Sequence, residues 1–274
     1  MEREREFSFT QKDFLFIRNL VADQTGISLS EAKSHLVYSR LSRRLRSLNI
    51  SSFAQYCDYL TNGESDELTH FINAITTNLT AFFRENHHFE YLANTLLPKI
   101  FSSNSNRRVR IWSAGCSTGE EPYSIAIVLR ENMPSKGGWD VKVLATDLDT
   151  NVVAKAASGV YQESSINGIS SQRVKRFFSK NSRSGTVTVK PEVRDLITFK
   201  QLNLMHEWPV KGPFDVIFCR NVVIYFNLET QKRLFKRYAD ILADKGHLFI
   251  GHSESLFKVT NVFELLGNTI YQKK

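Results

Sequence analysis

The sequence lacks the features that mark several classes of protein. Its only cysteines, Cys57, Cys116 and Cys219, are too far apart for a disulfide framework or a zinc cluster. No apolar run approaches the roughly 18 residues of a membrane-spanning helix. The charged start of the chain, residues 1–6, is followed by no apolar stretch of the kind found in secretory signals. We therefore expect a cytoplasmic protein with reduced thiols and no direct membrane insertion.

The composition is that of a globular chain with a basic surface. Hydrophobic residues make up 42% and charged residues 23% of the 274 residues, which is enough for a core and excludes wholesale disorder. At about 150 residues per domain, the length predicts one or two domains. The net charge of +8 indicates an acidic partner. Two stretches, 32–57 and 164–191, contain five and six Lys or Arg and no Asp or Glu.

The first part of the chain predicts only helices. Thr10 and Asp13 resemble a capping box that begins a helix, and Gly26 ends it. Further helices are predicted near residues 30–48, 52–60 and 65–75. Because strand alternation is missing here, we expect a small all-α domain with its linker at residues 1–90.

From Arg108 onward, apolar strands alternate with helices. Strands are predicted at 109–112, 141–145, 214–219 and 246–251, and helices at 120–131, from 151 and at 229–242. Continuous apolar strands between helices indicate a parallel sheet that is covered on both faces. Residues 186–189 and 197–199 form either a small antiparallel insertion or one excursion plus one core strand. The tail at 263–271 predicts a closing hairpin.

Polar groups follow the predicted strands where ligands bind in open parallel sheets. They are the glycine-bearing loop from Gly115 to Gly119, then Asp147, and after later strands Asn203 and Arg220 with their neighbours. Such a loop, followed by an acid after the next strand, favours a nucleoside whose ribose hydroxyls donate to Asp147. Asp147 could instead cap the next helix, a role that Asp149 could fill equally well.

The charge at this loop selects among nucleosides. Glu120 and Glu121 begin the helix after the loop, so a pyrophosphate there would be repelled. A nucleoside that carries positive charge suits the loop better. S-adenosyl-L-methionine, with its sulfonium and ammonium groups, is such a ligand.

Four motifs resemble a known family, the bacterial chemotaxis-receptor glutamate O-methyltransferases (CheR). They are Thr-Asn-Leu-Thr-Ala-Phe-Phe-Arg at 77–84, Ser-Thr-Gly-Glu-Glu-Pro-Tyr-Ser at 117–124, Phe-Cys-Arg-Asn-Val-Val-Ile-Tyr-Phe at 218–226 and Gly-His-Ser-Glu at 251–254. The resemblance extends from Phe14 to Tyr271, with the motifs in the family's order.

This resemblance implies an α/β fold and an activity. The fold would be a Rossmann-like S-adenosylmethionine-dependent methyltransferase domain at 91–274, with a small antiparallel β insertion at about 165–200, preceded by the all-α domain. The enzyme would methylate glutamate carboxylates of chemoreceptors for sensory adaptation, with S-adenosyl-L-homocysteine as product and no metal. Its partner would be the cytoplasmic helical bundle of receptors in membrane-bound arrays, and we expect a monomer.

The resemblance also assigns residues to roles. It implies a catalytic role for Arg84 and Tyr225, and cofactor contacts from Asn78, Thr80, Arg84, Glu121, Asp147, Asn203, Leu204, Arg220 and Asn221. Glu121 is preferred to Glu120. Plainer roles remain open: Arg84 as an interdomain salt-bridge partner, Tyr225 as a core aromatic and Asn203 as a turn residue.

Two further groups of residues are interpreted from the sequence. The basic residues Arg40, Arg43, Arg44 and Arg46 would dock the acidic helices of receptors, or would simply form a solvated face. His87 and His88 invite interpretation as metal ligands, but adjacent residues on a helix diverge, so we predict that they lie on the linker surface.

Two other functions are considered. The basic charge would suit an RNA-binding protein or RNA methyltransferase. However, residues 220–225 lack the Asn/Asp-Pro-Pro-aromatic run common in enzymes that methylate exocyclic amines, so we expect no nucleic-acid partner. A catalytically inactive signalling scaffold is the other alternative, and the intact motifs argue against it.

Overall fold

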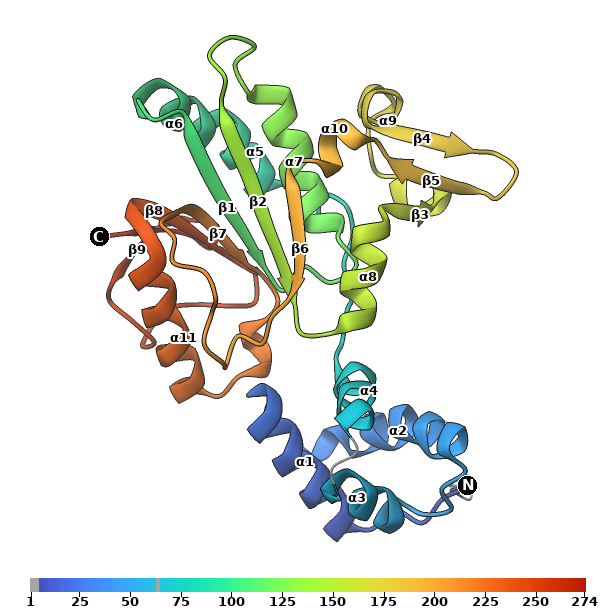
Figure 1. The fold of residues 1–274 in the computed structure, drawn as a ribbon. Coiled ribbons are helices and arrows are strands. Elements are labelled where there is room, and N and C mark those ends of the chain that lie inside the picture. Colours follow the sequence, from blue (N-terminus) through green and yellow to red (C-terminus); the bar gives the residue numbers. More distant parts are fainter. Residues whose placement is uncertain (1–4, 63–64) are drawn as a thin grey trace. The chain divides into compact units, whose positions relative to one another are not determined.

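The computed structural model describes residues 5–62 and 65–274 (Figure 1). The first residues of the charged start, 1–4, lie outside this part. The chain forms two compact units, one of Met1–Thr77 with Tyr225–Thr230 and one of Asn78–Ile224 with Gln231–Lys274. The units divide before the boundary predicted near residue 90. The reason is that Phe82 and Phe89 are buried in the core of the second unit.

The first unit is built from the predicted helices. They are α1 (Gln11–Thr25), α2 (Ser34–Leu48), α3 (Phe53–Thr61) and α4 (Ser65–Ile75), with a 3-10 turn at Glu31–Lys33 before α2. The capping box of Thr10 and Asp13 is present, and Gly26 ends α1 with φ of 73°. These local signals confirm the predicted helix ends.

A buried carboxylate ties the helices of the first unit together. Glu67 of α4 accepts hydrogen bonds from the Arg44 guanidinium and from the Tyr56 hydroxyl, the latter at 2.6 Å. Glu67 is only 4% exposed, so both bonds offset the cost of burying its charge. Apolar side chains of all four helices surround this group, among them Phe14, Leu41, Tyr56 and Phe71.

The second unit contains a seven-stranded sheet in the order β6-β2-β1-β7-β8-β10-β9 (Figure 1). Strands β6, β2, β1, β7 and β8 are parallel, and the hairpin of β9 and β10 closes the sheet in antiparallel fashion, as predicted. The strands are β1 (Arg108–Ala114), β2 (Asp140–Asp147), β6 (Ile197–Gln201), β7 (Phe214–Cys219), β8 (Leu242–Ile250), β9 (Phe263–Gly267) and β10 (Ile270–Lys273).

Both faces of the sheet are covered, which explains the continuous apolar strands. Ile111 of β1 belongs to the core that includes Ile125 of α7 (Glu120–Asn132). The next residue, Trp112, points to the opposite face and packs on Tyr238 of α11 (Leu228–Ile241), with ring centroids 5.5 Å apart. The predicted α/β class is confirmed. Other helices of the unit are α5 (His87–Tyr91), a π-helical turn (Leu92–Leu96), α6 (Leu97–Ser103) and α8 (Thr150–Ser158).

A separate small sheet settles which of the two predicted arrangements is correct. Strands β3 (Val160–Gln162), β5 (Thr186–Val189) and β4 (Phe178–Asn181) form an antiparallel sheet, with α9 (Ser171–Phe177) before β4. By contrast, β6 pairs with β2 after the short helix α10 (Pro191–Arg194). Residues 186–189 therefore belong to the insertion and 197–201 to the main sheet.

The start of α7 yields a test of this fold. Gly119 has φ of 100°, and a Cβ there would lie 2.7 Å from the Tyr161 hydroxyl and 2.8 Å from the Ala156 Cβ. Backbone strain in Gly119→Ala should therefore lower the free energy of unfolding by about 1–3 kcal/mol, and the close contacts of the new Cβ should add to this loss. Urea denaturation measures this change. Gly168→Ala, where a Cβ meets nothing within 4 Å, is the control and should be near neutral. Equal stability of the two variants would contradict the strained turn.

Candidate cofactor site at the carboxyl edge of the sheet

The loop after β1 bends back onto the end of β2. The N–H groups of Gly115 and Cys116 donate to the Thr146 carbonyl oxygen, at 2.8 and 2.9 Å. Gly115 has φ of 103°, and a Cβ there would lie 2.4 Å from Val222 Cγ2, so only glycine fits this approach. The loop is thus held against the edge where strands β1, β2 and β7 end.

Asp147 lies at the end of β2 beside this loop. Its carboxylate accepts from the N–H groups of Ser117 at 2.8 Å and Asp149 at 3.1 Å. Burial raises its pKa. The helix α8 is capped instead by Asp149, whose side chain accepts from the N–H groups of Asn151 and Val152. Of the two roles considered for Asp147, helix capping therefore falls to Asp149.

The segment before α5 runs along the same loop. The Asn78 side chain donates to Asp149 Oδ2 at 2.8 Å, and the Asn78 carbonyl accepts from the Ser117 hydroxyl at 2.8 Å. Arg84 donates from its guanidinium to the Leu79 carbonyl at 2.8 Å. Thr80 lies between them, partly exposed. The first family motif and the glycine loop are therefore joined directly.

An ion-pair network lies at the ends of β7 and β1. Arg220, 2% exposed, contacts Glu121 Oε2 at 3.1 Å and Glu85 Oε2 at 3.2 Å. Ser113 of β1 donates to the other oxygen of Glu121 at 2.7 Å. Arg220 also donates to the Arg84 carbonyl. Two carboxylates therefore share one guanidinium in a buried place.

The two carboxylates of this network differ in their pKa. Burial acts to raise the pKa of Glu85, but the hydrogen bond from His252 and the positive charge of Arg220 lower it to about 2. Burial raises the pKa of Glu121 despite the opposing effect of Arg220. Glu120, its neighbour, accepts instead from the Thr118 hydroxyl at 2.6 Å. Glu121, rather than Glu120, points into the network.

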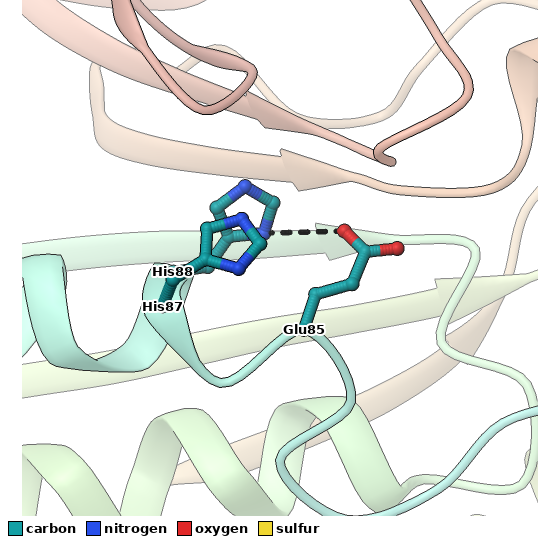
Figure 2. A group of neighbouring side chains, drawn as sticks. All are labelled: Glu85, His87 and His88. Carbon is teal, nitrogen blue, oxygen red and sulfur yellow. Dashed lines mark ion pairs between the residues drawn. The ribbon is translucent and has the colours of Figure 1, made fainter.

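The structure corrects the interpretation of His88 (Figure 2). We predicted a linker-surface residue, but His88 is fully buried, since α5 packs on the sheet. Its Nε2 bonds the Asn268 carbonyl at 2.9 Å, and its Nδ1 faces Glu85 Oε2 at 3.6 Å. Burial, together with the Arg220 charge, lowers its pKa to about 4.

Glu85, His87 and His88 each offer a possible metal ligand, and the three atoms lie within 4.8 Å of one another (Figure 2). No role was predicted for Glu85 from the sequence, and it is this carboxylate that completes the group. However, Arg220 already contacts Glu85 at 3.2 Å, and His252 Nδ1 donates to it at 2.8 Å. We therefore assign Glu85 to the ion-pair network.

Two other segments reach this edge. Asn203 accepts from the Met205 N–H at 2.9 Å, which agrees with a turn role, and the Leu204 carbonyl accepts from Arg237 at 2.6 Å. Asn221 follows β7 with φ of 58°, and its N–H donates to Glu254 at 2.9 Å. Glu254 belongs to the Gly-His-Ser-Glu motif at 251–254, but no role was predicted for it from the sequence.

Residues of the first unit carry the remaining predictions. Arg40 donates to the Ile75 and Thr76 carbonyls, and Arg44 is bound to Glu67. Both therefore stabilise the helical unit. The structure also pairs Arg46 with Glu6, and leaves the Arg43 side chain exposed. Tyr225 ends the 3-10 turn Val223–Tyr225, and its carbonyl accepts from the Ser28 N–H at 2.8 Å.

Comparisons with known proteins agree with these motifs. Residues 12–76 match the model of the CheR methyltransferase all-alpha domain, and residues 78–272 match that of the CheR methyltransferase SAM binding domain. The chain is 45% identical over 272 residues to chemotaxis protein methyltransferase 2 of Pseudomonas aeruginosa, covering 97% of this chain and 95% of the relative.

Two further relatives cover similar shares. A probable chemotaxis protein methyltransferase of Rhizobium etli is 44% identical over 262 residues, 92% of this chain and 96% of the relative. The chemotaxis protein methyltransferase of Escherichia coli is 40% identical over 276 residues, 99% of this chain and 94% of the relative. These similarities favour a chemotaxis methyltransferase over an RNA methyltransferase or an RNA-binding protein.

The ion-pair network predicts a pH-dependent effect on stability. Arg220→Met leaves Glu121 without its cation and should lower the free energy of unfolding by about 3–5 kcal/mol at neutral pH. Without Arg220, the effect of burial on Glu121 is opposed less, so its pKa in the folded variant lies further above its pKa in the unfolded chain than it does in the wild type. Protonation then favours the folded state, so the loss should shrink as pH falls.

Urea denaturation at neutral and mildly acidic pH measures both effects. Arg43→Met, at an exposed position of α2, is the control and should change stability little. A loss for Arg220→Met that stays constant with pH would contradict the role given to Glu121.

Proposed function

Because the chain belongs to the CheR family of methyltransferases, we propose that it methylates glutamate carboxylates of chemoreceptors with S-adenosyl-L-methionine. The products would be glutamate methyl esters and S-adenosyl-L-homocysteine, and the reaction would serve sensory adaptation. No helix in the described part of the chain is long and apolar enough to cross a membrane. We propose that the enzyme works in the cytoplasm, as a monomer recruited to receptor arrays.

The observation that carries the proposal is the excess of carboxylates at the edge of the sheet. Glu121 is buried there and Asp147 is partly buried, and desolvation raises both pKa values. A ligand with positive charge would favour their ionised forms. The cofactor carries a sulfonium and an ammonium group, and Asp147 would accept hydrogen bonds from its ribose hydroxyls.

The remaining cofactor contacts are proposed from the family motifs. They comprise Asn78, Thr80, Arg84, Asn203, Leu204, Arg220 and Asn221. The structure supports this set because Asn78 bonds the glycine loop and Arg220 bonds Glu121. Arg84 and Tyr225 would orient the reacting groups. We propose that no metal takes part.

The proposed chemistry needs no proton transfer. A glutamate with ordinary pKa near 4.3 is already ionised at neutral pH. One of its oxygens forms the new O–CH₃ bond as the C–S bond breaks, and the electron pair of that bond stays on sulfur. Opposite charges cancel in the transition state, which water stabilises less than the separated ions. A site that aligns the two atoms and excludes water therefore accelerates the transfer, with alignment contributing up to about 7–11 kcal/mol.

Label transfer tests the proposed function. The protein is incubated with methyl-tritiated S-adenosylmethionine and membranes that contain chemoreceptors. We expect label on the receptor that alkali releases as methanol, because methyl esters are base-labile. Receptors with the methylated glutamates replaced by alanine are the control. Label that resists alkali, or label on RNA, would contradict a glutamate methyl ester as the product and reopen the RNA-directed alternative.

Asp147 provides a test of the cofactor site. Asp147→Ala should weaken S-adenosylmethionine binding by about 1.5–3 kcal/mol, the value of hydrogen bonds to a charged group. Isothermal titration calorimetry measures the change. Asp140→Ala, at the other end of the same strand, is the matched control and should keep the affinity. Unchanged affinity in a folded Asp147 variant would remove this residue from the site.

The docking surface is best tested at Arg43. Arg44 and Arg40 hold the helical unit together, so their replacement would confuse docking with folding. Arg43→Glu should raise the receptor KM and leave cofactor affinity unchanged, with a larger effect at low salt, since exposed charges act through screened attraction. Steady-state kinetics at two salt concentrations measures this effect. Lys236→Glu, an exposed basic site on α11, is the control. An unchanged receptor KM would contradict a docking role for Arg43 and indicate that its side chain is only solvated.

A further inference from the structure

The buried carboxylate of Glu254 accepts hydrogen bonds from several backbone N–H groups of the turn after β7. Glu254 Oε2 accepts from the N–H groups of Asn221 at 2.9 Å and Gly251 at 2.5 Å. Its Oε1 accepts from Val223 at 2.8 Å and Ile224 at 3.2 Å. Glu254 is only 5% exposed. Both oxygens are therefore saturated by main-chain donors that belong to one turn and to the end of β8.

The same turn is pressed between two glycines. A Cβ at Gly115 would lie 2.4 Å from Val222 Cγ2. A Cβ at Gly251 would lie 2.4 Å from the Asn221 side-chain nitrogen and 2.8 Å from its backbone nitrogen. Asn221 itself has φ of 58°, a left-handed conformation that costs energy for residues with a side chain, although less for asparagine than for most. Contacts on both sides and the bonds to Glu254 offset this cost.

Two of the four donors bound by Glu254, the N–H groups of Val223 and Ile224, are ones that a short helix leaves unpaired. Val223 begins the 3-10 turn Val223–Tyr225, and the first N–H groups of a helix have no partner within it. A carboxylate satisfies them and suits the positive end of the turn. A neutral amide could accept at one oxygen only, and its NH₂ group would face the remaining donors.

From this arrangement we infer that Glu254 is a positioning residue for methyl transfer. It fixes the turn that presents Asn221 and leads directly into Tyr225, and its own oxygens are already occupied by main-chain donors. The inference rests on the proposed function of Asn221 and Tyr225. A positioning role differs from a purely structural one in its consequence. Without the carboxylate, the protein would stay folded, but the turn would hold its side chains in the wrong place.

The variant Glu254→Gln keeps the size of the side chain and removes one acceptor. We expect kcat to fall by roughly 10- to 100-fold, the effect of an error of about 1 Å in placement. The affinity for S-adenosylhomocysteine should fall several-fold through Asn221. The receptor KM should stay within about a factor of two, since docking lies elsewhere. Kinetics well below the melting temperature and calorimetry give these values.

A matched variant separates positioning from stability. Asp215, at the start of β7, is a partly buried carboxylate that accepts from the Arg110 N–H at 2.7 Å. Asp215→Asn removes an acceptor at the opposite end of the same strand and should lower the melting temperature while keeping kcat. If Glu254→Gln loses melting temperature like Asp215→Asn and keeps its kcat, the positioning role is overturned.

Hydrogen exchange of the unaltered protein gives a test that is independent of activity and of the variant's folding. The amides of Asn221, Val223 and Ile224 should be protected in the free protein. Exchange at the rate of an open loop would overturn the inference. If the wild-type protein shows this protection but labels no receptor, the proposed function fails while the description of the turn stands.

Discussion

The buried guanidinium of Arg220 is the interaction on which the second unit depends. It stands at the end of β7 and contacts Glu121 at the start of α7 and Glu85 from the linker. Arg220 favours the ionised form of both carboxylates, and among the described residues it is the only cation in contact with Glu121, so its loss would leave a buried acid unpaired. One side chain therefore joins the linker, the central strand and the helix that follows the glycine loop.

This dependence explains the path of the linker. Phe83 and Glu85 have φ of 55° and 56°, a left-handed backbone that non-glycine residues seldom adopt. The cost is offset because the Phe83 N–H donates to the Ser124 hydroxyl at 2.9 Å and the Glu85 carboxylate forms an ion pair with Arg220. Two unusual conformations two residues apart bring Glu85 to the edge of the sheet and leave His88 to be buried behind it.

Local signals made much of the fold predictable. The capping box at Thr10, the stop at Gly26 and the apolar strand at 214–219 depend on neighbouring residues, and all appear in the structure. The burial of His88 was not predictable, since it depends on contact with Asn268, far along the chain. Similarly, Arg44 was predicted to lie on a docking surface, because the sequence does not show that Glu67 of α4 lies beside it.

The candidate site was predictable in its residue types but not in its partners. Parallel topology places the ends of β1, β2 and β7 together, so Asp147 and Arg220 were expected at one edge. Which carboxylate meets Arg220 depends on the linker path, and Glu85 was missed for this reason. The role of Glu254 was missed because its partners are backbone groups, which have no signature in the sequence.

The glycine loop shows why this edge suits a cationic nucleoside and not a pyrophosphate. A phosphate site needs N–H groups that are open to the ligand. Here Gly115 and Cys116 donate to Thr146, and Ser117 donates to Asp147. Glu120 and Glu121 then occupy the first turn of α7, where they oppose any anion. With the N–H groups of Gly115, Cys116 and Ser117 already bonded and two acids at the start of α7, this edge suits a ligand that brings positive charge and hydroxyl donors better than it suits an anion.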